Sequence, residues 1–275
     1  MNPDTYLLDW IPHENLDWFY LSRNPHPCAI QLLQSNPLAI DWDMLSSNPN
    51  PDAIELLKLY PDKINWFHLS KNSNPSAIDV LKANPDNIHW SNLSSNTHPD
   101  AIDMLKANRD RIHWSNLSAN SNANPDAMYL LIMNPDRIHW SNLSKNPNAL
   151  YLLEANPDRI DWSHLSLNPE AIDLLEANLT KIDWSGLSLN SNPCAMELLQ
   201  SNPYKIDWRY LSINPNPTAM KLLKANPNRI NWSHLALNTN PYAMELLQSN
   251  QDKIDWGFLS RNPRIFKGSN SLNSC

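Results

Sequence analysis

Glycine and cysteine are scarce in this chain, whose 275 residues include only 3 of each against 23 Pro and 12 Trp. With so few glycines, the sequence holds no Gly-rich loop of the kind that cradles phosphates. This balance is unusual for a compact globular enzyme. The three cysteines, Cys28, Cys194 and Cys275, are odd in number and far apart, so we expect no disulfide framework.

The sequence also lacks long apolar segments. No apolar run approaches the roughly 20 residues that cross a bilayer, and the start MNPDTYLLDW has no basic segment followed by an apolar core. We therefore expect an intracellular protein that does not enter a membrane. The net charge of −7 and the pI near 5.7 predict overall repulsion from nucleic acid and anionic membranes.

What the sequence does contain is one short unit, repeated eleven times. Its tryptophans are spaced 24 residues apart, except for one gap of 26 and two of 22. They are Trp18, Trp42, Trp66, Trp90, Trp114, Trp140, Trp162, Trp184, Trp208, Trp232 and Trp256, with Trp10 outside the series. Such a period is typical of a solenoid, in which each unit stacks on its neighbours.

The unit reads N-P-x-A-[IM]-x-L-L-x-x-N-P-[DN]-[KR]-I-[DNH]-W-S-x-L-S-x-N, and an Asn closes every copy. All length changes fall between the Leu-Ser pair and the next Ala, which indicates a surface loop there and packed structure elsewhere. We expect one repeat domain at 1–263, with a core that includes a continuous ladder of Trp side chains, followed by a polar C-terminal tail at 264–275.

The first half of a unit predicts a helix of about nine residues. In NPDAIELLKLY (50–60), Asn50 suits an N-cap and Pro51 the first helical position. Ala53, Ile54, Leu56 and Leu57 form an apolar face. An Asn after the helix, such as Asn84, suits a left-handed C-terminal residue in a chain with little Gly.

The second half predicts another, shorter helix. The residue before each Trp is Asp, Asn or His, and the first two are among the best N-caps. Taking Asp161 as N-cap pairs Ile160 with Leu165 as a hydrophobic staple, and Trp162 lies three residues before Leu165 on one helix face. A variant begins this helix at the second Asn-Pro instead, which lengthens it.

These elements predict an all-α protein, an α-solenoid of about eleven 22–26-residue two-helix repeats. With helices about 8–10 Å apart, eleven units would make a superhelical rod on the order of 100 Å long. The alternative treats Ile-x-Trp as a strand, giving a leucine-rich-repeat-like α/β solenoid. The Asp/Asn caps and the Trp–Leu spacing favour the helix.

Stacking turns each aligned position into a column, and the cap column includes His89, His113 and His139 in succession. A shared zinc would need imidazole nitrogens within about 2 Å of the metal, whereas adjacent units are about a helix diameter apart. We expect these histidines to bind neighbouring polar groups, and we predict no metal and no cofactor.

A second column is basic and includes Arg111, Arg137 and Arg159. Most of its cations follow an Asp, and no exposed aromatic pattern accompanies them for base stacking. A solvated, salt-bridged face is therefore favoured over nucleic-acid binding.

A third column, on the first helix, is acidic in most units but holds Tyr129 and Tyr151 in the middle ones. The same units carry the histidine caps and the loop-length changes. The candidate partner surface therefore comprises Tyr129, Tyr151, His89, His113, His139, Arg111, Arg137 and Arg159, with drift at surface positions as the alternative explanation.

Signals of catalysis are weak. Ser163, His164 and Asp161 lie within four residues, but such residues recur in repeating columns rather than in one converging constellation. We predict that the protein is not an enzyme.

The unit NPDRIDWSHLSLNPEAIDLLEAN (156–178) resembles the short Asn-Pro and Trp-Leu-Ser repeats of largely uncharacterised proteins encoded by giant nucleocytoplasmic DNA viruses, over almost the entire chain. The resemblance implies a virus-encoded protein and assigns no catalytic residue or partner. Asp9, Pro12 and His13 depart from the unit, and together with the polar tail they predict capping ends.

The sequence thus predicts a monomeric, non-catalytic repeat scaffold that mediates protein–protein interaction with a host or viral partner in the host cytoplasm. The alternative is a structural virion component, and nucleic-acid binding is a less favoured third.

Overall fold

A computed structural model describes residues 6–121 and 125–268 of the chain. Within these ranges it contains 21 α-helices and short 3₁₀ helices, and the one β-type pairing is an isolated bridge between Leu7 and Phe266. The predicted all-α repeat fold is confirmed. The strand of the leucine-rich-repeat alternative is wrong, because each tryptophan of the repeat series is the first residue of a helix.

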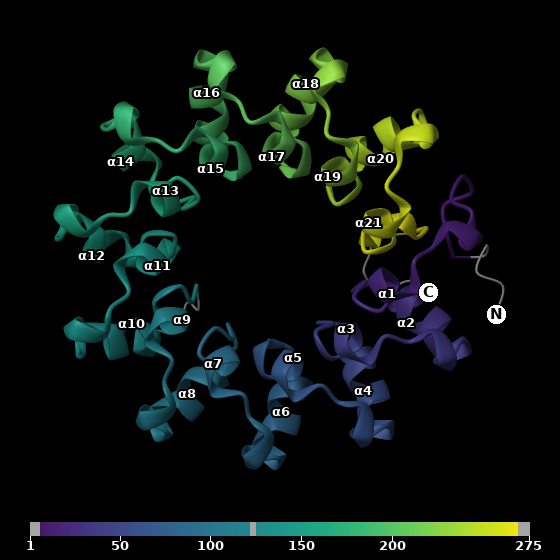
Figure 1. Ribbon diagram of the computed structural model, residues 1–275, viewed down its shortest axis with the longest axis horizontal. Coiled ribbons are helices and arrows are strands. Elements are labelled where there is room, and N and C mark those ends of the chain that lie inside the picture. The colour runs from purple at the N-terminus through teal and green to yellow at the C-terminus, as the bar shows by residue number, and fades with distance from the viewer. Residues whose placement is uncertain (1–5, 122–124, 269–275) are drawn as a thin grey trace.

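The helices form two concentric circles (Figure 1). The inner circle contains α1 (Trp18–Leu21), α3 (Trp42–Ser46), α5 (Trp66–Lys71), α7 (Trp90–Leu93), α9 (Trp114–Ser118), α11 (Trp140–Ser144), α13 (Trp162–Leu165), α15 (Trp184–Leu189), α17 (Trp208–Ile213), α19 (Trp232–Ala236) and α21 (Trp256–Ser260). The outer circle contains α2 (Pro27–Ser35), α4 (Pro51–Leu59), α6 (Pro75–Ala83), α8 (Pro99–Ala107), α10 (Pro125–Ile132), α12 (Leu150–Glu154), α14 (Ile172–Glu176), α16 (Pro193–Ser201), α18 (Pro217–Ala225) and α20 (Pro241–Gln248).

The outer helices begin as their sequence predicts. In α4, the Asn50 side chain accepts a hydrogen bond from the Asp52 N–H, Pro51 is the first helical residue, and the helix is nine residues long. Their ends differ from the prediction. Asn84 has φ −133° rather than a left-handed backbone, and its side-chain amide donates to the Val80 carbonyl at 2.9 Å. The amide satisfies a terminal carbonyl, so no positive φ is needed.

The second Asn-Pro opens a separate 3₁₀ turn, such as η5 (Pro85–Asn87), followed by the two extended residues Ile88 and His89. The variant with a lengthened second helix is therefore wrong. The inner helix starts at the predicted cap: the Asp161 side chain accepts from the His164 N–H, while Ile160 and Leu165 are buried. Local capping thus fixes both helix starts.

The core lies between the two circles and consists chiefly of the repeated Ala, Ile or Met, and Leu side chains. The tryptophans of the repeat are half-buried and pack against this core. Lys181 places its Nζ 4.3 Å from the Trp162 ring centroid, a cation–π contact between neighbouring units. Tryptophan therefore borders the core at each junction, and the aliphatic side chains fill it.

Two buried polar columns join consecutive units. Ser46 Oγ accepts from the Asn65 N–H of the next unit at 3.0 Å and donates to the Trp42 carbonyl at 2.8 Å. Two residues after each such serine, an Asn crosses the junction. Asn72 Nδ2 donates to the carbonyls of Ser46 at 3.1 Å and Asn48 at 2.8 Å, and its Oδ1 accepts from the Asn74 N–H at 3.0 Å. Buried amides with these bonds satisfied hold each unit in register.

The members of the two columns are buried in every unit. The serine column is Ser22, Ser46, Ser70, Ser94, Ser118, Ser144, Ser166, Ser188, Ser212 and Ser260, with Ala236 in the remaining unit. The asparagine column is Asn24, Asn48, Asn72, Asn96, Asn120, Asn146, Asn168, Asn190, Asn214, Asn238 and Asn262.

The eleven units close into a ring, so the predicted open rod is wrong (Figure 1). The last unit contacts the first through the serine and asparagine bonds that join the other units, of which only the junction after Ala236 lacks the serine bond. Asp17 N–H donates to Ser260 Oγ at 2.8 Å, and Asn24 Nδ2 donates to the carbonyls of Ser260 at 2.9 Å and Asn262 at 3.1 Å. The first and last units therefore contact each other instead of capping a rod.

Closure also extends the folded domain beyond the predicted boundary at 263. Ile265 and Phe266 are fully buried, and the Phe266 ring stacks on His26 with centroids 4.7 Å apart. Leu8 N–H donates to the Ile265 carbonyl at 2.9 Å, and Lys267 Nζ lies 2.7 Å from Asp9 Oδ1. The described part of the predicted tail, residues 264–268, thus belongs to the ring.

Neighbouring inner helices are joined by direct hydrogen bonds across each junction, such as that from the Asn65 N–H to Ser46 Oγ. Each outer helix lies farther from the centre than the inner helix of its unit (Figure 1). The eleven units together complete one turn.

Two further sequence expectations are tested by the structure. Cys28 is buried and disulfide-bonded, although we expected no disulfide framework, while Cys194 is exposed and free. In the described ranges, no helix has the length and apolar character required to span a membrane.

Candidate functional site

Tyr129 and Tyr151 lie on neighbouring outer helices, α10 and α12, at the circumference of the ring (Figure 1). Their side chains are 53% and 50% exposed. The aligned position in most other units holds Asp or Glu. Two tyrosine side chains thus replace carboxylate side chains at this solvent-facing position.

Two apolar residues that were not predicted enlarge this surface. Ile132 is 45% exposed and Met133 is 59% exposed. They follow Tyr129 by three and four residues, so the three share one helix face, and the Met133 N–H donates to the Tyr129 carbonyl at 3.0 Å. The unit alignment could have revealed them, because α8 has Lys106 and Ala107 at these positions. We call Tyr129, Ile132, Met133 and Tyr151 the outer apolar patch.

The three histidines of the predicted surface belong to the other circle of helices. His89 and His139 cap α7 and α11, where their Nδ1 atoms accept from the N–H groups of Asn92 at 3.4 Å and Asn142 at 3.3 Å. His113 precedes α9 without a side-chain cap bond. The structure therefore does not group the histidines with the two tyrosines, and two of the three act as helix caps.

The three arginines lie in 3₁₀ turns: η6 (Arg109–Arg111), η7 (Pro135–Arg137) and η9 (Pro157–Arg159). All three side chains are exposed, and Arg111 Nε lies 3.4 Å from Asp110 Oδ2. Arg137 belongs to the turn that follows α10, so it is the arginine closest in sequence to the exposed face of that helix.

One cluster brings Ser, His and Asp together across two units. Ser141 Oγ donates to Asp161 Oδ2 at 2.7 Å and lies 3.0 Å from His164 Nδ1, and this Nδ1 is 3.1 Å from the same Asp161 oxygen. In a catalytic triad, Ser and Asp bind opposite ring nitrogens. Here both approach Nδ1, so the ring does not connect them in series.

The same contacts set the charge state of Asp161. Burial raises the pKa of its carboxyl group, but the hydrogen bonds from Ser141 and His164 outweigh that effect and hold the pKa below its usual value. The cluster therefore stabilises an ionised carboxylate at the start of α13, where the helix N-terminus favours negative charge.

Across residues 6–121 and 125–268, no three His, Cys, Asp or Glu side chains are grouped so as to hold a metal ion. The histidine column is spread over successive units and does not converge.

Comparison with family models, with curated proteins and with solved structures gives no match to this chain.

Proposed function

We propose that the protein is a non-catalytic ring scaffold that binds a protein partner through the outer apolar patch. The observation that supports this most strongly is the exposed face of α10, where Tyr129, Ile132 and Met133 occupy positions that α8 fills with Asp103, Lys106 and Ala107. An exposed apolar face of this kind typically marks an interaction site.

The partner would offer an apolar groove. Side chains at i, i+3 and i+4 form a ridge on one helix face, and such a ridge packs into a groove of another protein. Because α10 lies on the convex circumference of the ring (Figure 1), a separate molecule can approach it. The repeated Ser and Asn bonds fix the ring, so the helix is presented in one conformation.

As part of this proposal, the chain is a monomer encoded by a giant virus and acts in the host cytoplasm. The sequence resemblance supports that origin. Ring closure supports the monomer, because neither end of the solenoid remains open for stacking on a second copy.

The test is a substitution that gives α10 the surface of α8: Tyr129→Asp, Ile132→Lys and Met133→Ala. A matched control removes exposed apolar side chains elsewhere, with Leu59→Ala and Tyr204→Asp, which also copy residues from aligned positions. Tagged intact ring, patch variant and control variant would each be used to capture proteins from infected cells.

We expect a protein that is recovered by the intact ring and the control but lost with the patch variant. That protein, once purified, should bind the intact ring at least about tenfold more tightly than the patch variant. Equal recovery by all three would refute the role of the patch. Recovery chiefly of capsid proteins, unaffected by the substitutions, would favour the structural virion alternative.

A further inference from the structure

A second candidate site lies on the inner side of the ring, facing its axis and away from the outer apolar patch. A cavity of about 490 Å³ is lined by residues from six units, which are the first three and the last three of the chain. Each lining residue immediately follows the buried serine or alanine of its unit, or comes two or three positions after it. The cavity therefore forms where the C-terminal ends of inner helices face one another.

Ring closure creates this cavity. Lys71 ends α5, the third inner helix, and Ile213 ends α17, the ninth, and the two residues are 142 positions apart in the chain. They line one cavity because the junction between α21 and α1 brings the first and last units together. Its volume is within the roughly 300–1,000 Å³ of small-molecule pockets.

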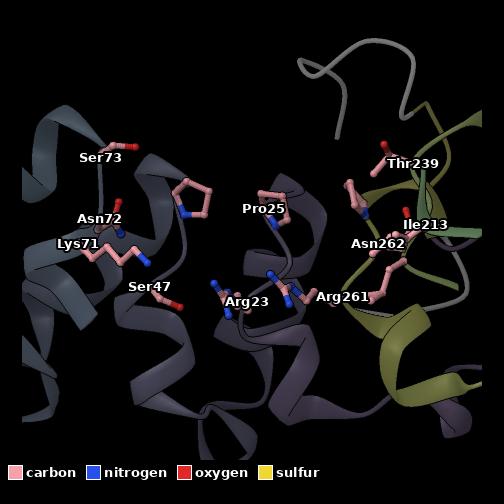
Figure 2. A pocket seen from close by; sticks show the side chains of 13 residues that line it. Arg23, Pro25, Ser47, Lys71, Asn72, Ser73, Ile213, Thr239, Arg261 and Asn262 are labelled. Atoms are coloured by element: carbon pink, nitrogen blue, oxygen red, sulfur yellow. The ribbon is translucent and has the colours of Figure 1, made fainter. Parts of the chain in front are cut away.

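One side of the cavity is cationic. Arg23, Arg261 and Lys71 line it, and none of its described lining residues is Asp or Glu. Figure 2 shows the nitrogen-bearing ends of Arg23 and Arg261 beside each other, with Lys71 directed toward them. Burial and the positive charge of Arg261 lower the pKa of Arg23. Three cations thus share a pocket without a lining carboxylate, in a chain whose net charge is −7.

The opposite side is aliphatic. Ile213 and Leu237 line the cavity at the position that Arg23 and Lys71 occupy in their own units. The two preceding units continue this character with Leu167 and Leu189, which are 37% and 38% exposed. Four consecutive units therefore carry an aliphatic residue at this position, next to the units that carry the cations.

We propose that this axial pocket binds a small phosphate monoester with an aliphatic portion. The phosphate would bind Arg23, Arg261 and Lys71, because paired guanidinium groups hydrogen-bond phosphate oxygens bidentately and a dianion balances several cations. The aliphatic portion would contact Ile213 and Leu237. This site is independent of the outer apolar patch.

Calorimetric titration of the full chain with hexyl phosphate, inorganic phosphate and 1-hexanol tests both halves of the pocket. We expect hexyl phosphate to bind at least about tenfold more tightly than inorganic phosphate, because its methylene groups leave water. Hexanol should not bind measurably. Rising salt should weaken hexyl phosphate binding, because ions screen the three cations.

Arg261→Gln should weaken hexyl phosphate binding by at least about tenfold, since a charge-assisted hydrogen bond is lost. Lys145→Gln is the matched control, because Lys145 has the same place in its unit but does not line the cavity, and its binding should be unchanged. Leu237→Ser should reduce the preference for hexyl phosphate over inorganic phosphate. Thermal denaturation followed by circular dichroism shows that each variant is folded.

Several outcomes would overturn the proposal. Absence of binding by the intact ring, or equal binding by the intact ring and Arg261→Gln, would remove the site. Binding to phosphatidylcholine vesicles that contain phosphatidic acid, without binding to hexyl phosphate, would identify a membrane lipid headgroup and refute a free small ligand.

Discussion

Replacement of Ser46 by Ala tests whether the serine column stabilises the junctions between units. The hydroxyl is fully buried, accepts from the Asn65 N–H of the next unit and donates to the Trp42 carbonyl. Alanine keeps the packing volume nearly unchanged but leaves that N–H without its acceptor. The ring offers the reverse experiment at Ala236, where the serine hydroxyl is naturally missing.

The magnitude follows from the loss of one hydrogen bond. A buried donor without a partner costs about 1–3 kcal/mol. Because the donor residue, Asn65, is only half-buried, we expect about 1–2 kcal/mol for Ser46→Ala. Ala236→Ser should stabilise the ring by about 0.5–1.5 kcal/mol, the net value of a new hydrogen bond, through acceptance from the Asp255 N–H.

Unfolding in guanidinium chloride, followed by Trp fluorescence and by circular dichroism, measures these changes in the free energy of unfolding. Coincident curves from the two probes would justify a single free energy of unfolding, and each kcal/mol should shift the melting temperature by about 2–4 °C. Ser95→Ala is the control, because Ser95 is adjacent to the column but donates only to a carbonyl of its own helix, that of Asn92, at 2.9 Å. If Ser46→Ala destabilises no more than Ser95→Ala, and Ala236→Ser gains nothing, the column does not stabilise the junctions.

Three further predictions concern other contacts. Asn72→Asp should destabilise the ring by more than about 3 kcal/mol in guanidinium unfolding, because a buried carboxylate would face two carbonyls. Asn87→Asp, at an exposed position, is the control, and an equal loss of stability in this variant would contradict the prediction. Phe266→Ala should lower the free energy of unfolding by about 3–5 kcal/mol, because this side chain is fully buried at the closing junction. Phe67→Ala, at a 51% exposed position, should lower it far less. Similar losses of stability in the two variants would argue against closure. The folded-state pKa of Asp161 is lowered, so its stabilising effect should be present above the unfolded-state pKa of about 4 and be lost as pH falls through the folded-state pKa. The melting temperatures of Asp161→Asn and the intact chain should therefore converge in acid. Parallel plots of melting temperature against pH would refute this.

The helices could be predicted because their starts depend on neighbouring residues. Asn50 and Asp161 cap their helices through side-chain bonds to N–H groups two or three residues later, and such bonds are visible in sequence spacing. The end of the outer helix was predicted wrongly. The Asn84 amide reaches back to the Val80 carbonyl, and composition alone does not distinguish this bond from a left-handed cap.

Two members of the outer apolar patch could be found from the sequence. Aligning the units identified Tyr129 and Tyr151 as replacements for acidic residues, and the same alignment contained Ile132 and Met133. It could not show that the histidine caps lie on the inner circle, because column positions do not say which face of the stack each column occupies.

The sequence by itself determined the number of units, their two helices and their caps, since these depend on contacts within one repeat. Only the tertiary structure decided that the units close into a ring and that Arg23, Lys71 and Arg261 line one pocket. Closure depends on the angle between neighbouring units, which the Ser and Asn bonds across each junction hold. That angle adds over eleven junctions, and no local pattern in the sequence specifies its sum.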